Sequence, residues 1–243
     1  MTSISIKTAA TTPLQTIMPE ALDMESHTAP LGVDGTSAPL PELKVTRPLK
    51  IPTGVSSNSK QHVLLVRDRS TSMCGSKIDE LNLASVALCQ ILADPQNKDG
   101  FLVSIIDFDN GSERRCFAEL AVGLVVPTAI SQGGTNFDSA LLESIQTIED
   151  FKALPNPAGW VYLRPQVLFL SDGQSSVSDK NIQTLQEIAD VTTIAYGGDA
   201  DTSTLARIAS DGQVHVVGTQ GGELRKFLAD VGQTLSQSLA TAR

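Results

Sequence analysis

Three oxygen-bearing side chains occupy alternate positions where an apolar run of the sequence ends. The run "HVLLV" is followed by Asp68, Ser70 and Ser72. In an extended or gently turned segment, side chains two positions apart point the same way. The three oxygens can therefore converge on one point. Two further oxygen donors stand later in the chain, Thr135 in "SQGGTNFD" and Asp172 in "LFLSDGQ".

Two carboxylates and three hydroxyls form a ligand set for a hard divalent cation. Mg²⁺ prefers oxygen ligands in octahedral geometry and keeps several waters. The two carboxylates would neutralise the ion, and a position left to water could accept an incoming carboxylate. We therefore predict a metal site made of Asp68, Ser70, Ser72, Thr135 and Asp172.

Strand and helix patterns alternate over about 180 residues around these positions, which predicts a mostly parallel sheet covered on both faces. Ligands bind such sheets beyond the carboxyl ends of the strands, where Asp68 and Asp172 stand. We predict strands at 62–68, 101–109, 116–126, 166–172, 191–198 and 213–218, with 116–126 as an antiparallel edge strand. We predict helices at 77–94, 136–151, 179–190 and 202–209, and a last one along the apolar stripe Leu224, Phe227, Leu228, Val231, Leu235 and Leu239.

Several of these residues also have ordinary structural interpretations. Thr135 has the capping-box spacing with Asp138, as Ser76 has with Asp79, so either could cap a helix. Ser70, Ser72 and the Asp172–Gly173 pair could be turn residues. Their joint occurrence favours the metal site.

Asp107 and Asp109 could form a second acidic site. We favour the alternative that both are solvated residues leading into a hairpin at Asn110–Gly111.

Composition restricts the partners and the compartment. The net charge is −9 and no long basic run occurs, so nucleic acid is not an expected partner. No stretch reaches the length of a membrane span, and the N-terminus lacks a secretory signal. The three cysteines include no CxxC pair, which fits a reducing cytoplasm.

The first quarter of the chain differs from the rest. Residues 1–59 hold seven of the twelve prolines and many Ser and Thr, without lasting periodicity. We predict that they form a mostly disordered or extended arm and that residues 60–243 form one domain. Within the arm, "PELKVTRPLKIP" at 41–52 is a candidate to dock as an edge strand or a strap, although a loose linker is the simpler interpretation.

Three motifs in order carry a family resemblance over most of residues 60–240. "DRSTSMCGSKI", "GGTNFDSAL" and "LFLSDG" resemble a von Willebrand factor type A (VWA) domain with its metal-ion-dependent adhesion site (MIDAS). The resemblance implies a three-layer, Rossmann-like α/β fold and the same five ligands. It also implies Mg²⁺, or sometimes Mn²⁺, with the last coordination place taken by a partner's Glu or Asp.

Within that family, "GWVYLRPQVLFLSDGQ" and "ELRKFLADVGQTLSQSL" are similar to the bacterial intracellular TerY-like group. That group is associated with tellurite resistance and stress systems, beside a Ser/Thr kinase and a PP2C-type phosphatase. Two residues depart from the family pattern. Arg67 replaces an apolar residue and could compete for Asp68 or recruit an acidic partner, and Thr71 replaces a common Gly.

The expected function is that of a non-enzymatic, metal-dependent binding module in the cytoplasm. The alternative is a Mg²⁺-dependent phosphotransferase of the haloacid dehalogenase type, which also has an Asp at the end of the first strand. That chemistry needs an acid–base Asp two residues after the nucleophile. Ser70 occupies this position, which disfavours the enzyme.

Overall fold

The computed structural model describes residues 58–156 and 158–241 of the chain. The predicted arm, apart from its last two residues, lies outside them, and so does the segment at 41–52. The first strand begins at Ser59, next to the domain boundary predicted at residue 60. None of the helices in the described residues is long and apolar enough to cross a membrane.

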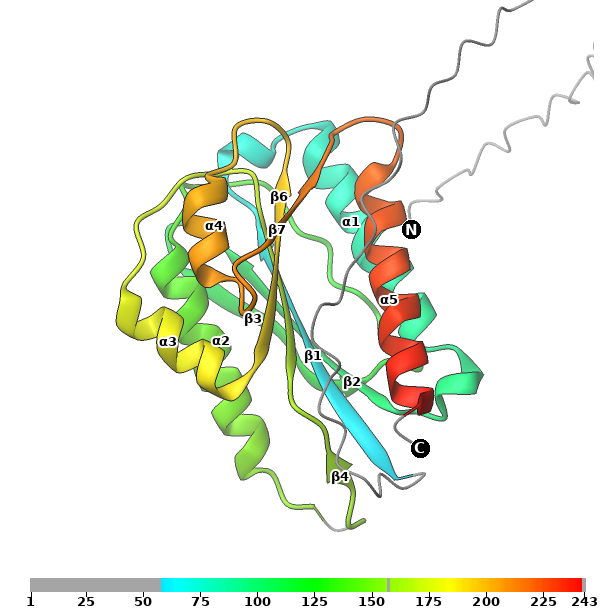
Figure 1. Cartoon of the computed structure of the whole chain (residues 1–243). Coiled ribbons are helices and arrows are strands. Elements are labelled where there is room, and N and C mark those ends of the chain that lie inside the picture. Colours follow the sequence, from blue (N-terminus) through cyan, green and yellow to red (C-terminus); the bar gives the residue numbers. More distant parts are fainter. Residues whose placement is uncertain (1–57, 157, 242–243) are drawn as a thin grey trace, which may run out of the picture. The chain divides into compact units, whose positions relative to one another are not determined.

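A seven-stranded, mostly parallel sheet forms the centre of the domain (Figure 1). Its strand order is β3-β2-β1-β5-β6-β7, and the short β4 pairs with the start of β1. Only the β2–β3 pair within this sheet is antiparallel, which places β3 at one edge. The strands are β1 (Ser59–Asp68), β2 (Phe101–Phe108), β3 (Ser112–Leu120), β4 (Val161–Tyr162), β5 (Gln166–Ser171), β6 (Asp190–Tyr196) and β7 (Val214–Val217).

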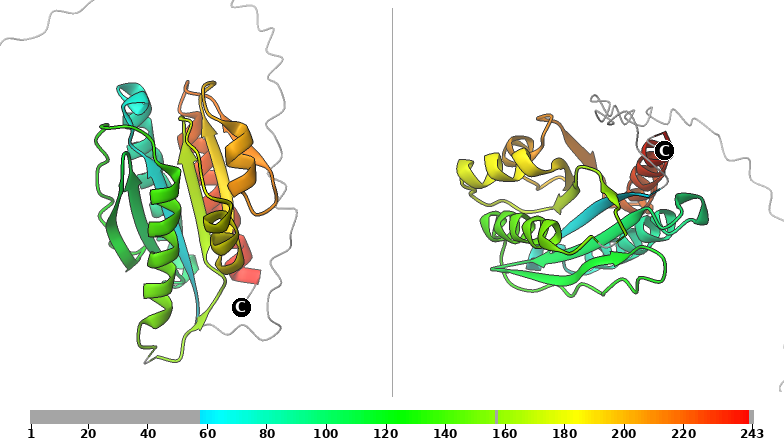
Figure 2. Two further views of the ribbon diagram at one scale, coloured as in Figure 1. Left: turned by 90° about the vertical axis from the view of Figure 1, so that its left-hand side faces the viewer. Right: turned by 90° about the horizontal axis from the view of Figure 1, so that it is seen from below.

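Helices cover both faces of the sheet, as Figure 2 shows from two further sides. Helices α1 and α5 pack against each other on one face, while α2, α3 and α4 lie on the other. The helices are α1 (Ser76–Leu92), α2 (Phe137–Ala153), α3 (Asp179–Ile188), α4 (Thr202–Ile208) and α5 (Glu223–Thr241), with short 3₁₀ turns η1 (Thr71–Met73) and η2 (Pro95–Asn97). The predicted α/β class, with its antiparallel edge strand, is confirmed.

Strand β1 is buried along its whole length because helices cover both of its sides. Leu64 and Val66 belong to the core cluster beneath α2 and α3. Residues of the opposite parity, including Arg67, face α1, because Arg67 donates a hydrogen bond to Ser85 of that helix. Because side chains alternate along β1, Arg67 and Asp68 point to opposite faces of the sheet.

The structure corrects one predicted strand. Strand β3 begins at Ser112 and ends at Leu120, whereas we predicted 116–126. The prediction followed apolar letters, but an edge strand needs few of them, and the charged stretch "SERR" opens β3. After Leu120 the chain turns, with Leu124 N–H bonded to the Ala121 carbonyl.

Neither capping-box spacing noted in the sequence produces a helix cap. Gly75 is the N-cap of α1, and its positive φ of 78° suits glycine. Asn136, not Thr135, is the N-cap of α2, and its side-chain oxygen accepts from Ser139 N–H at 3.0 Å. The Asp138 carboxylate instead accepts from Ser178 N–H at 2.8 Å, ahead of α3. The capping interpretation of Thr135 therefore does not hold.

Candidate metal centre

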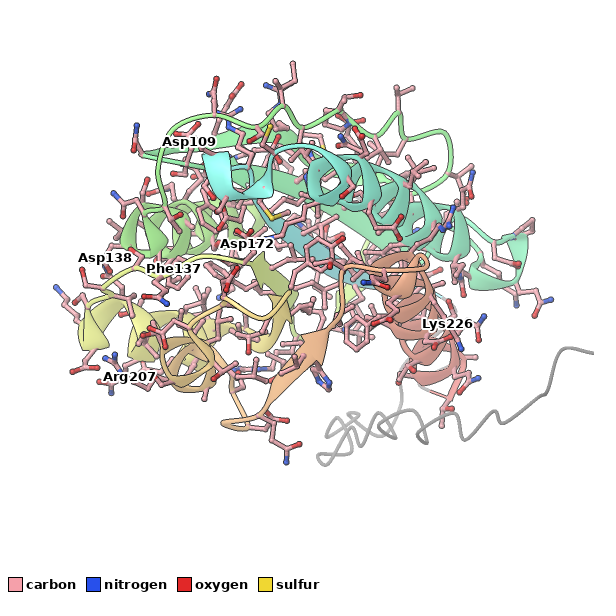
Figure 3. All side chains as sticks on the ribbon, turned by 90° about the horizontal axis from the view of Figure 1, so that it is seen from above. Asp109, Phe137, Asp138, Asp172, Arg207 and Lys226 are labelled. Carbon is pink, nitrogen blue, oxygen red and sulfur yellow. The ribbon has the colours of Figure 1, made fainter. Side chains whose placement is uncertain are left out.

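The predicted ligands gather at the carboxyl edge of the parallel strands. Asp68 ends β1, and Asp172 directly follows β5, the neighbouring strand. Figure 3 looks onto this edge and shows Asp172 close to the middle of the domain. Asp68, Ser70 and Asp172 are each at most 2% exposed, whereas Ser72 is exposed and Thr135 half-buried. The site therefore has a buried part that contains the two carboxylates, while Ser72 leaves it open to solvent.

The loop after β1 folds back on its own carboxylate. Ser70 N–H donates to Asp68 Oδ1 at 2.8 Å, which turns the chain so that the two serine hydroxyls meet. Ser70 Oγ and Ser72 Oγ lie 2.9 Å apart. The convergence of Asp68, Ser70 and Ser72 expected from their spacing is thus present.

Asp172 joins this cluster across the sheet. Its Oδ1 accepts a hydrogen bond from Ser72 Oγ at 2.7 Å. Its Oδ2 forms an ion pair with Lys77 Nζ at 2.5 Å. A continuous chain of polar contacts therefore runs from Asp68 through the two serines to Asp172.

Thr135 reaches the same edge from the segment before α2. A Cβ built on Gly173 would lie only 2.8 Å from Thr135 Oγ1, so this threonine occupies the space that the glycine leaves. A side chain at position 173 would therefore displace Thr135. All five predicted residues are in one place.

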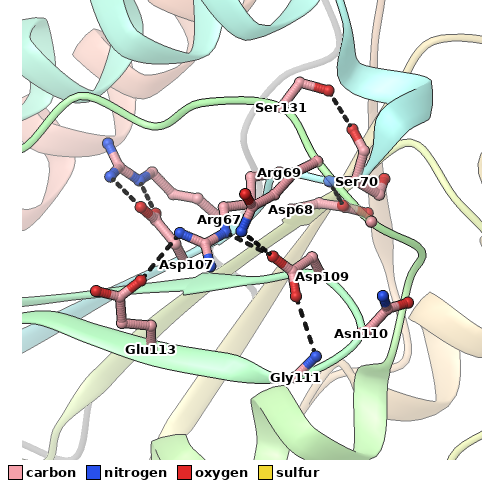
Figure 4. A network of polar contacts seen from close by, with 12 residues as sticks. Arg67, Asp68, Arg69, Ser70, Asp107, Asp109, Asn110, Gly111, Glu113 and Ser131 are labelled. Carbon is pink, nitrogen blue, oxygen red and sulfur yellow. Dashed lines mark hydrogen bonds and ion pairs between the residues drawn. The ribbon is translucent and has the colours of Figure 1, made fainter.

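The segment that carries Thr135 is fastened to the loop after β1. Thr71 donates to the Gly133 carbonyl from its N–H at 3.0 Å and from its hydroxyl at 2.6 Å. The Ser131 hydroxyl donates to the Ser70 carbonyl at 2.8 Å, as Figure 4 shows. Thr71 therefore holds together the two loops that carry Ser70, Ser72 and Thr135.

Helix α1 and the β2–β3 turn support this segment from two sides. Asn82 of α1 exchanges two hydrogen bonds with the backbone of Ala129, at 2.8 and 3.0 Å. The Asn110 side chain accepts from Gly134 N–H at 2.9 Å. The position of Thr135 thus depends on elements that contribute no predicted ligand.

Arg67 does not contact the carboxylates of the candidate metal site. Its side chain is fully buried, and its guanidinium makes a two-fold contact with Asp107, at 2.7 and 3.1 Å (Figure 4). A further bond reaches the Pro127 carbonyl at 3.0 Å. Neither alternative that we considered from the sequence holds, because alternation along β1 turns Arg67 away from Asp68 and the guanidinium has no access to a partner.

Asp107 and Asp109 are not solvated, contrary to our favoured interpretation. Asp107 is 0% and Asp109 9% exposed. Asp107 pairs with Arg67, and Asp109 pairs with Arg69 at 2.9 Å. Since the two carboxylates are bound to arginines, they do not form a second acidic site.

The environment of Asp68 opposes its charge. Burial raises the pKa of Asp68 to about 6, and the nearby charge of Asp172 acts in the same direction. Hydrogen bonds from Ser171 and Ser70 partly offset this effect. Ser171 Oγ lies 2.5 Å from Asp68 Oδ2. A cation at this edge would favour the ionised carboxylate.

The residues present fit an oxygen-ligated divalent ion. Within residues 58–156 and 158–241, no three His, Cys, Asp or Glu side chains gather as a metal cluster. A metal here would therefore depend on hydroxyls as well as on its two carboxylates. The Thr135 hydroxyl, close to Gly173, and the buried carboxylates of Asp68 and Asp172 supply both kinds of oxygen donor.

Sequence reasoning missed three contributors to this site: Lys77, Ser171 and Asn82. Lys77 and Ser171 stand within the quoted motifs, but their contacts with carboxylates depend on how the fold places β1, β5 and the start of α1. The Asn82–Ala129 contact joins residues far apart in the sequence. Nothing in the sequence pattern could have indicated that contact.

No protein-family model matches this chain, and a search of curated proteins finds no relative. Solved structures do match. A von Willebrand factor type A protein from Catenulispora acidiphila is 17% identical, with a TM-score of 0.53 over 74% of this chain and 43% of that one. The ArnB paralog VWA2 from Sulfolobus acidocaldarius is 19% identical, with a TM-score of 0.52 over 71% and 44%.

Another match is the proximal thread matrix protein 1 from the mussel byssus, solved with a zinc-occupied MIDAS motif. It is 19% identical, with a TM-score of 0.52 over 75% of this chain and 47% of that one. This chain spans less than half the length of all three proteins. At such identities the likeness concerns the fold alone, and the domain has the von Willebrand factor type A fold.

Proposed function

We propose that this chain is a metal-dependent protein-interaction module that holds a divalent cation at the carboxyl edge of its sheet. The observation that carries the proposal is the convergence of Asp68, Ser70, Ser72, Thr135 and Asp172 there. A zinc-occupied MIDAS motif in a protein of the same fold supports it. The donor set, made only of oxygens, favours Mg²⁺ or Mn²⁺ in this chain.

The ligand that we propose is a Glu or Asp of another protein. When bound, the metal would supply a Lewis-acidic coordination place for that carboxylate. The chain's own residues do the rest: Asp68 and Asp172 supply negative charge, and the hydroxyls of Ser70, Ser72 and Thr135 supply neutral donors. Exposed Ser72 marks the accessible side.

We further propose an adaptor role in a bacterial stress or tellurite-resistance type system, in the cytoplasm. The partner would be a Ser/Thr kinase or a PP2C-type phosphatase. The support is the similarity of "GWVYLRPQVLFLSDGQ" and "ELRKFLADVGQTLSQSL" to the TerY-like group.

The proposed module is not an enzyme. For phosphoryl transfer, the residue two positions after Asp68 would have to act as an acid, but Ser70 contributes a hydroxyl in contact with Ser72. Purified protein with Mg²⁺ should not turn over phosphoryl substrates. Turnover that disappears in Asp68→Asn would instead favour the haloacid dehalogenase alternative.

Affinity capture tests the interaction itself. The full chain, immobilised in Mg²⁺, should retain a partner that EDTA releases and that Asp172→Ala does not capture. Glu149→Ala is the matched control, since Glu149 is an exposed carboxylate on α2 and its loss should change nothing. Equal capture by all variants with and without EDTA would contradict the proposal.

A further inference from the structure

One cation, Lys77, contacts a predicted ligand in the described part of the chain. Its Nζ lies 2.5 Å from Asp172 Oδ2, and its side chain is 22% exposed while that of Asp172 is 0% exposed. The other two cations near the end of β1 are engaged elsewhere: Arg67 with Asp107, and Arg69 with Asp109 and Glu113. Lys77 is therefore the charge that balances Asp172.

The place of Lys77 in its helix is unfavourable for helix stability. Lys77 is the second residue of α1, where the positive end of the helix dipole disfavours a cation. The ion pair with the Asp172 carboxylate offsets this cost.

The ammonium group lies beside the residue that follows β6. Gly197 follows β6 with φ of 91°, and a Cβ built on it would lie 3.7 Å from Lys77 Nζ. Lys77 Nζ is thus placed between Asp172 and the end of β6. Because the side chain is partly exposed, it can withdraw toward solvent when another cation approaches Asp172.

From these contacts we infer that Lys77 is a tethered cation that shares Asp172 with the metal and thereby sets the metal affinity of the site. This inference rests on the proposed function. A divalent ion bound by Asp68 and Asp172 is electrically balanced, and the ammonium adds one unbalanced positive charge nearby. Lys77 must then either move away or repel the ion, and both weaken metal binding.

The test is the dissociation constant of Mn²⁺ for the full chain, measured from the electron paramagnetic resonance signal of free Mn²⁺. Lys77→Met and Lys77→Gln should each bind Mn²⁺ about tenfold more tightly than wild type. Lys77→Arg keeps the charge and should stay close to wild type. Two neutral variants are used because either one alone could fail to fold, and far-UV circular dichroism shows that they are folded.

The matched control is Lys180→Met. Lys180 is also the second residue of a helix, α3, and it is exposed. Its removal relieves the same helix-dipole penalty far from the edge, and the Mn²⁺ affinity should not change.

Folded neutral variants of Lys77 that bind Mn²⁺ no more tightly than wild type would overturn the inference and leave the proposed function standing. Absence of Mn²⁺ uptake by wild type and all variants at millimolar metal would contradict the proposed function itself, and the inference with it.

Discussion

At the scale of single residues, Thr135 allows the proposed metal binding to be tested separately from helix stability. The N-cap of α2 is its neighbour Asn136, so the two roles that Thr135 could combine are divided between two residues. The hydroxyl of Thr135 lies beside Gly173, at the candidate metal site. This division makes a paired experiment possible.

Thr135→Ala should lower the affinity for Mg²⁺ or Mn²⁺ and weaken partner binding, and should change the free energy of unfolding of the metal-free protein by about 0.5 kcal/mol or less. Asn136→Ala should do the reverse, because loss of an N-cap costs about 1 kcal/mol of stability. Urea unfolding in EDTA and metal titration measure the two quantities. A loss of stability in Thr135→Ala equal to that in Asn136→Ala, with metal affinity intact, would return Thr135 to a structural role.

The single residue His62 makes the stability of the fold depend on pH. The ring is fully buried on β1 and contacts Ser104 Oγ at 2.8 Å through Nε2. Burial lowers the pKa of His62 to about 3, and the charge of Arg114 acts in the same direction. Between pH 6.5 and about 3 the unfolded chain therefore binds a proton that the native state excludes.

The native state should lose stability as pH falls through this window. Compared with His62→Gln, which takes up no proton, wild type should lose about 2 kcal/mol of unfolding free energy between pH 7 and pH 5. Other titrating groups, Asp68 included, cancel in this difference. Urea titrations in EDTA at the two pH values measure it. A difference that does not change with pH would mean that the native state accommodates the charged ring.

At the scale of elements, the buried pair of Arg67 and Asp107 joins parts that the sequence separates. It links β1 to β2, and Arg67 also reaches Ser85 of α1 and the Pro127 carbonyl. Pro127 precedes the segment that carries Thr135. The Arg67–Asp107 pair therefore helps to hold the segment that carries Thr135, although neither residue is a predicted metal ligand.

Arg67→Met should destabilise the domain by roughly 3–5 kcal/mol, because it leaves the Asp107 carboxylate buried with only Arg115 at 3.8 Å. The double variant Arg67→Met/Asp107→Leu should recover most of that loss, since no unpaired charge remains. Chemical denaturation of wild type, both single variants and the double variant completes the cycle. A double variant as unstable as the sum of the two single variants would show that the ion pair is not the relevant interaction.

The order of strands and helices could be predicted from the sequence, because periods of 2 and 3.6 residues reflect burial directly. The contacts made at the ends of elements could not. Period 2 places Arg67 on the other face from Asp68, but it does not reveal that Asp107 lies opposite on β2. The N-cap of α2 could not be assigned from the sequence, because Thr135 and Asn136 are both suitable caps. The backbone angles and the hydrogen bond from Ser139 N–H identify Asn136.

The same holds at the candidate site. Spacing predicted the convergence of Asp68, Ser70 and Ser72, which a local turn produces. The order of the three motifs added Thr135 and Asp172. The ion pair of Lys77 with Asp172 depends on where the fold brings the start of α1 relative to the end of β5, which local sequence does not encode.

At the scale of the whole molecule, the described domain contains a sheet, its two helical layers and the candidate metal site. We predict that residues 1–40 are dispensable for its folding, because their sequence lacks core periodicity. A chain that begins at residue 41 should keep the melting temperature of the full chain within about 2 °C. Brief proteolysis should leave the same core. A truncated chain that fails to fold would make the arm part of the domain.

Five oxygen-bearing residues are proposed to hold a divalent metal, and a thermal melt can show whether they do. A ligand present at about 100 times its dissociation constant adds about 2.7 kcal/mol to stability. Millimolar Mg²⁺ should therefore raise the melting temperature of wild type well above its value in EDTA. The same comparison in Asp172→Asn should give no shift. Equal melting temperatures of wild type in Mg²⁺ and in EDTA, or the same shift in Asp172→Asn, would contradict the account.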